Sequence, residues 1–142
     1  MSIKIGQASL GETGGRNQQP GNQTGRELNI SNWYNGRWLG VLRYKSRKKA
    51  ERAAQTCEAA IKNRNIGYDM DNRNTAYEAA RAVGWDVSRI AKPVETDCSA
   101  LMMLCAVVQA ARRSKRSTVG RATAAPPTVC CTIGQQREIL CC

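Results

Sequence analysis

The sequence contains no histidine and no phenylalanine, and aromatic residues make up only 5% of it. Without histidine, the imidazole that usually accepts the proton of a nucleophilic thiol is missing. Without phenylalanine, a core has to be built from alanine, valine, leucine and isoleucine. The 142 residues, 42% of them hydrophobic, are enough for one domain with a real core and too few for two.

Long apolar runs are also absent. No stretch reaches the roughly 18 residues that we expect of a membrane-spanning helix, and the first residues lack the apolar region of a signal peptide. We therefore expect a protein without membrane insertion, cytoplasmic when made, that reaches any outside target only after release.

Acidic residues are half as frequent as basic ones, 11 against 22, and the formal net charge is +11. Such a charge attracts anionic partners over a distance. Nucleic acid, an acidic cell wall and a membrane surface all fit, and the charge does not choose among them.

The seven cysteines are an odd number without the spacing of a disulfide framework. Cys57 and Cys105 lie on apolar helical stripes, where they are expected in the core. The other C-terminal cysteines form the adjacent pairs Cys130-Cys131 and Cys141-Cys142. Adjacent cysteines lack the Cys-x-x-Cys spacing that turns two thiolates onto one zinc ion, so we expect no metal and no cofactor.

Residues 95–105 (ETDCSALMMLC) join a polar segment to an apolar run. Thr96 or Asp97 can cap a helix whose first turn contains Cys98. The positive end of a helix favours the thiolate, which is the nucleophilic form of cysteine, so a lowered pKa is expected for Cys98. Many free cysteines are instead small core residues, and these residues alone leave both roles open for Cys98.

Upstream, alanine-rich stripes predict helices over residues 46–65 and 74–83, the second ended by Gly84. Asn35-Gly36 between two apolar and aromatic runs predicts a β-hairpin over residues 28–44. Residues 6–26, rich in Gly, Gln, Asn and Thr, are predicted to be loop.

Two surface features have two interpretations each. The hairpin aromatics either pack on the sheet or form a platform for sugars or bases. They are Trp33, Tyr34, Trp38 and Tyr44. The basic residues at 43–49 either form a solvated face or bind phosphates, although a basic run is unfavourable at a helix start.

The segment Asp97-Cys98-Ser99-Ala100-Leu101, with Ile66-Gly67-Tyr68-Asp69 upstream, resembles the nucleophile region of NlpC-type cysteine peptidases. These are papain-like enzymes that cut peptidoglycan stem peptides. Residues 21–27 (GNQTGRE), 31–34 (SNWY) and 72–75 (NRNT) follow the order found in phage-encoded cell-wall lysins of that group. The resemblance covers residues 18–108.

The resemblance implies an α+β fold with helices packed on a small antiparallel sheet. It makes Cys98 the nucleophile on a stem-peptide amide of bacterial peptidoglycan. It assigns substrate binding to Tyr68, which lines the cleft, and to Asp97 and Ser99, which contact the free amine of the peptide.

The pattern of the family stops after the Cys98 helix. There the family carries its catalytic histidine on a strand, and here residues 112–142 hold a basic run, a Pro126-Pro127 step and the cysteine pairs. We therefore expect residues 1–111 to be the N-terminal part of the peptidase domain and residues 112–142 to be a basic, disordered tail. Such a tail implies an aberrant or truncated C-terminus, the product of a frameshift or truncation, and leaves the sheet incomplete.

Three functions follow from these observations. The first is a cysteine-type peptidoglycan hydrolase that is inactive, or turns over slowly, for want of a histidine. The second is a basic nucleic-acid-binding protein, which no zinc finger, helix-turn-helix or basic zipper supports. The third is a remnant without catalytic activity.

Overall fold

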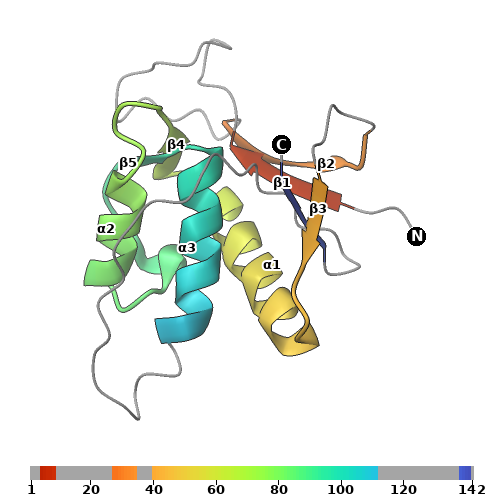
Figure 1. Cartoon of the computed structure of the whole chain (residues 1–142). Coiled ribbons are helices and arrows are strands. Elements are labelled where there is room, and N and C mark those ends of the chain that lie inside the picture. The colour runs from red at the N-terminus through yellow and green to blue at the C-terminus, as the bar shows by residue number, and fades with distance from the viewer. Residues whose placement is uncertain (1–3, 9–26, 35–39, 112–137, 142) are drawn as a thin grey trace.

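The computed structural model describes residues 4–8, 27–34, 40–111 and 138–141, and Figure 1 shows how their elements are arranged. In chain order these elements are β1 (Lys4–Ala8), β2 (Leu28–Asn32), β3 (Gly40–Arg43), α1 (Arg47–Lys62), β4 (Ile66–Tyr68), α2 (Thr75–Ala82), the short 3-10 helix η1 (Val87–Arg89), β5 (Val94–Thr96), α3 (Cys98–Ala111) and β6 (Glu138–Cys141).

Helix α3 lies between α1 and α2 and packs against both (Figure 1). Its apolar positions are buried at helical spacing, at Leu101, Leu104, Cys105 and Val108. The two neighbouring helices contribute mainly alanines, whose small side chains let helices approach closely. The core of the described residues is therefore organised around α3.

Within the described residues, the strands form three two-stranded sheets instead of one. β1 pairs with β2 and β3 with β6, both antiparallel, whereas β4 and β5 are parallel. The predicted α+β class with helices packed on small sheets is confirmed. The expectation of a single antiparallel sheet is wrong, since the β4–β5 pair is parallel.

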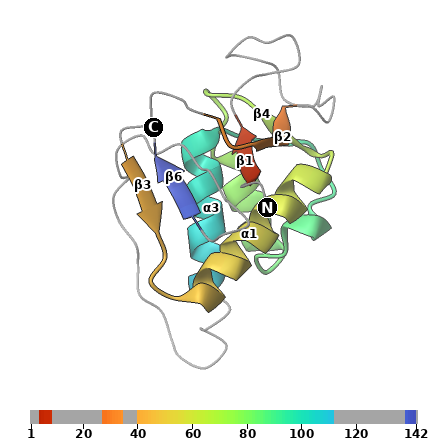
Figure 2. The ribbon, with the colours of Figure 1, turned by 90° about the vertical axis from the view of Figure 1, so that its right-hand side faces the viewer.

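The hairpin predicted over residues 28–44 is wrong in its pairing. β2 pairs with β1, and β3 pairs with β6, which lies beside it in Figure 2. A turn signal is local, whereas strand pairing follows the burial of side chains from distant segments. Leu28 of β2 and Ala8 of β1, which are register partners, are both buried in the core. The loop prediction for residues 6–26 is wrong for the part that forms β1.

The two upstream helices are confirmed as α1 and α2 within a few residues at each end. Cys57 and Cys105 are buried, as predicted. After α2 the chain passes through the left-handed region at two successive residues, Gly84 (φ 70°) and Trp85 (φ 67°). Glycine accepts this conformation without strain, which explains why α2 ends there.

Residues 138–141 of the predicted disordered tail form β6, while residues 112–137 lie outside the described part of the chain. Within the described residues, no helix has the length and apolarity needed to span a membrane.

β1 approaches α1 closely because residue 6 is a glycine (Figure 2). A Cβ atom added at Gly6 would lie 2.5 Å from the Cys57 Sγ and 3.1 Å from the Ile61 Cδ1. Real Cβ atoms essentially never come within the first of these distances, so even one methyl group has to displace the Cys57 side chain or shift the strand away from the helix.

We predict that Gly6→Ala lowers the free energy of unfolding by about 1–3 kcal/mol, the usual cost of overpacking a core. Denaturant unfolding of the wild type and variant measures it. Combining Gly6→Ala with Cys57→Ala removes the clashing sulfur, so the double variant should lose less stability than the two single changes added together. A Gly6→Ala variant as stable as the wild type would show that β1 is not packed against α1 in this way.

Candidate functional site

The predicted site residues meet at one edge of the fold, where β4 and β5 end and α3 begins (Figure 1). Because the two strands are parallel, their carboxyl ends lie together, with Tyr68 directly opposite Thr96. Asp97, Cys98 and Ser99 follow Thr96 immediately. The register of a single strand pair therefore brings Tyr68 to the Asp-Cys-Ser segment.

Asp97 caps α3. Its Oδ1 accepts hydrogen bonds from the Ala100 backbone N–H (2.7 Å) and from the Ser99 hydroxyl (2.8 Å), and its side chain is nearly inaccessible to solvent. The Thr96 hydroxyl instead donates to the Asp97 carbonyl oxygen at 3.3 Å. The predicted cap is confirmed, and Asp97 provides it. It satisfies one of the N–H groups that a helix start leaves without an intrahelical partner.

The second carboxylate oxygen of Asp97 lies 3.3 Å from Nη1 of Arg73, whose side chain is half exposed. Arg73 belongs to the turn between β4 and α2. Asp69 shapes that turn, since its Oδ1 accepts from the backbone N–H groups of Asp71 (2.6 Å) and Asn72 (3.2 Å). Asp97 is thus engaged on both oxygens by groups of the protein itself.

Tyr68 is buried, with a relative exposure of 5%. Its backbone N–H donates to Oε2 of Glu27 at 3.0 Å, and Glu27 is itself only 2% exposed. A buried carboxylate is stable only when hydrogen bonds or charges compensate it. Glu27 therefore joins the start of β2 to the end of β4 beside the site.

Cys98 is the first residue of α3 and is partly buried. Its pKa is raised above the ordinary value, first by burial and then by the negative charge of Asp97. Hydrogen bonding to the backbone of Ser99 and Cys98 and the positive charge of Arg73 act in the opposite direction and are outweighed. The lowered pKa predicted from the helix start is therefore wrong, because burial and Asp97 exceed the effect of the helix start.

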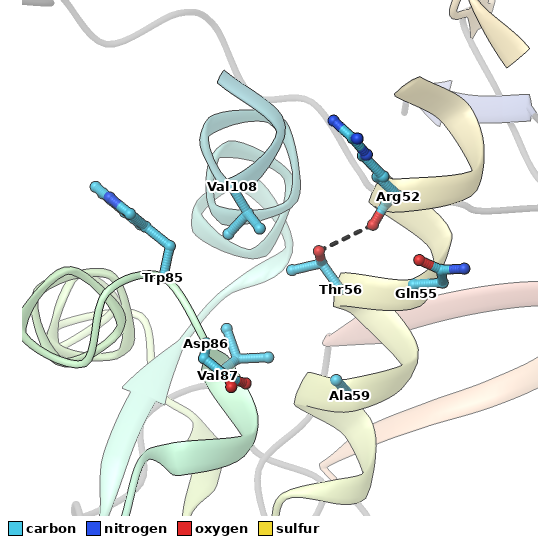
Figure 3. Close-up of a pocket in the computed structure, with 8 residues that line it drawn as sticks. All are labelled: Arg52, Gln55, Thr56, Ala59, Trp85, Asp86, Val87 and Val108. Carbon is cyan, nitrogen blue, oxygen red and sulfur yellow. Dashed lines mark hydrogen bonds between the residues drawn. The ribbon is translucent and has the colours of Figure 1, made fainter. Parts of the chain in front are cut away.

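A cavity of about 90 Å³ lies elsewhere, between α1, the far half of α3 and the segment after α2 (Figure 3). Its lining residues are Arg52, Gln55, Thr56, Ala59, Trp85, Asp86, Val87 and Val108. Val108 is ten residues beyond Cys98 on α3, which is about 15 Å along a helix. This cavity is therefore not part of the site at Cys98.

Within the described part of the chain, no group of three histidine, cysteine or acidic side chains is arranged to hold a metal ion. The side chains of the C-terminal cysteine pairs lie outside the described residues.

Two residues at this edge were not assigned a role from the sequence, Arg73 and Glu27. Both lie in segments on which the resemblance rests, Arg73 in 72–75 and Glu27 in 21–27. Membership of these segments was the one sequence signal that could have pointed to the two residues. Their contacts to Asp97 and Tyr68 join residues distant in the sequence, so local patterns could not predict them.

The family model described as Endolysin-like domain matches residues 5–129, which is most of the chain. The match includes residues 112–129, part of the segment expected to be an aberrant tail. No curated protein and no solved structure gives a match.

We predict that Asp97→Ala lowers the free energy of unfolding by about 0.5–2 kcal/mol, because it removes the cap of the central helix. Asp97→Asn is the matched variant, since asparagine caps helices as well as aspartate does. It should retain most of the stability. Thermal unfolding of the three proteins measures the difference. Equal losses in both variants would assign the stability to the charge of Asp97 instead of its capping hydrogen bond.

Proposed function

Because the chain belongs to the Endolysin-like domain family, we propose that it is a cell-wall hydrolase domain of the cysteine type, acting on bacterial peptidoglycan. Cys98 is the nucleophile on a stem-peptide amide in this proposal. Tyr68, Asp97 and Ser99 are the residues that the proposal assigns to peptide binding, and Ser99 is the most accessible of the three.

The observation that carries the proposal is the register of β4 and β5. In this register Tyr68 lies opposite Thr96, two residues before Cys98, which supports a site at the start of α3. Cys98 sits on a helix that is anchored in the core by its buried residues Leu101, Leu104 and Val108, so the position of the thiol is fixed. A nucleophile held by a rigid element suits covalent catalysis, since its position relative to a bound carbonyl is fixed.

In the proposed reaction the Cys98 thiol loses its proton to solvent, and the sulfur attacks the amide carbonyl. A carbon–sulfur bond forms, the carbon–nitrogen bond breaks, and the leaving amine takes a proton from water. Water then hydrolyses the thioester and regenerates the thiol. Histidine would ordinarily carry both protons, and its absence together with the raised pKa of Cys98 makes slow turnover the expected behaviour.

Asp97, to which the resemblance assigns contact with the free amine of the peptide, already has partners within the protein. Its carboxylate is buried and already holds Ala100, Ser99 and Arg73. Contact with the free amine of a stem peptide would therefore have to take place at the oxygen that faces Arg73, beside the guanidinium. Ser99 is partly exposed and can contact the peptide directly.

We predict slow release of muropeptides from purified peptidoglycan, detected by mass spectrometry, that is lost in Cys98→Ala. Cys105→Ala removes a buried thiol from the same helix and is the control that should retain the activity. Below the thiol pKa the rate should rise by up to about tenfold per pH unit, because it follows the thiolate fraction.

Equal cleavage by the wild type and Cys98→Ala would remove Cys98 from the reaction. If the wild type releases no muropeptides even at alkaline pH, the proposed hydrolase activity is wrong. The protein would then at most bind the cell wall.

A further inference from the structure

We propose that Arg73 is a positioning residue of this site, whose guanidinium, held on the Asp97 carboxylate, fixes the charge and the geometry around Cys98. This inference rests on the proposed role of Cys98 as the nucleophile. It concerns a residue to which neither the motif nor the family match assigns a task.

The turn that carries Arg73 is fastened to β5 at both of its ends. On one side the Asp69 backbone N–H donates to the Thr96 carbonyl at 3.2 Å. On the other side the Thr75 hydroxyl accepts from the Glu95 N–H at 2.7 Å and lies 3.3 Å from the Glu95 carbonyl oxygen. β5 ends two residues before Cys98, so the same strand positions both the turn and the nucleophile.

Internal hydrogen bonds hold the same turn between these two ends. Asp69 accepts from the N–H groups of Asp71 and Asn72, and the Thr75 N–H donates to the Asn72 carbonyl at 3.0 Å. The backbone at Arg73 is therefore fixed on both sides. A long side chain on a fixed backbone loses less conformational freedom when it forms an ion pair.

Several buried carboxyl side chains lie at this edge of the fold. Glu27 precedes β2, Asp69 follows β4 and Glu95 lies in β5, and all three are buried. Asp97, just before α3, adds a fourth buried carboxyl group. The guanidinium of Arg73 lies 3.3 Å from the Asp97 carboxylate, and its positive charge opposes the effect of Asp97 on the pKa of the Cys98 thiol. Without Arg73, both Asp97 and a thiolate at Cys98 would lose their positive neighbour.

Arginine cannot replace the missing histidine as a base, because its guanidinium keeps its proton at any ordinary pH. Its effect on Cys98 is therefore electrostatic and geometric. It favours the thiolate over the thiol and keeps Asp97 in the position that caps α3 and holds Ser99.

The test is the rate at which iodoacetamide alkylates Cys98 in the full chain, followed across pH by mass spectrometry of the Cys98 peptide. Arg73→Gln should slow the reaction by about two- to fivefold below the thiol pKa, less than the tenfold of a full pKa unit because Arg73 is half exposed. Arg73→Lys should recover most of the rate. The difference should shrink in high salt, which screens exposed charges.

Two further variants separate positioning from mere structural support. Arg81→Gln removes an exposed arginine from α2 and should leave the rate unchanged. Asp97→Asn keeps the cap but removes the opposing charge, so it should alkylate faster than the wild type. Loosening of the fold would expose Cys98 and speed alkylation, which is the opposite of the result expected for Arg73→Gln.

An unchanged or faster rate in Arg73→Gln overturns the proposal, as does an equal slowing in Arg81→Gln. Alkylation is measured without peptidoglycan, so its result does not depend on whether the protein hydrolyses the cell wall. Slower alkylation in Arg73→Gln together with no cleavage of the cell wall would support Arg73 while refuting the proposed function.

Discussion

The buried carboxylate of Asp97 at the start of α3 is the contact on which the site depends. One of its oxygens holds the Ala100 N–H and the Ser99 hydroxyl, and the other faces Arg73. Through these contacts it begins the central helix, fixes the residue after Cys98, and joins the α2 turn to the site. Since α1 and α2 both pack on α3, the direction of this helix sets the position of the whole helical layer.

The same packing that makes the site rigid also makes its thiol less reactive. Buried apolar residues hold α3 in the core. Cys98, at the start of this helix, is itself partly buried, and the loss of solvent raises the pKa of its thiol. In a cysteine hydrolase with a histidine, an imidazolium beside the sulfur can reverse this effect. Here Arg73 and the helix start are left to oppose it, which accounts for the slow chemistry that we propose.

The sequence predicted the parts of the fold that depend on local patterns. The alanine stripe of residues 50–60 predicted α1, Gly84 predicted the end of α2, and a cap at Thr96 or Asp97 predicted the start of α3. It failed where distant segments decide the structure. Asn35-Gly36 signalled a hairpin, but Leu28 pairs with Ala8 and β3 pairs with β6, and no local pattern encodes those partners. The reactivity of Cys98 was mispredicted for a similar reason, because the helix start is local whereas burial is a property of the whole core.

We propose that stem peptides bind at the edge formed by β4, β5 and the start of α3. The most direct test is an NMR titration of the labelled chain with a soluble muropeptide, which detects binding whether or not cleavage follows. We predict that the backbone amides of residues 67–73 and 96–100 shift together with one dissociation constant. Shifts confined to the exposed basic start of α1, or to the cavity beside Val108, would contradict the claim and move the cell-wall contact away from Cys98.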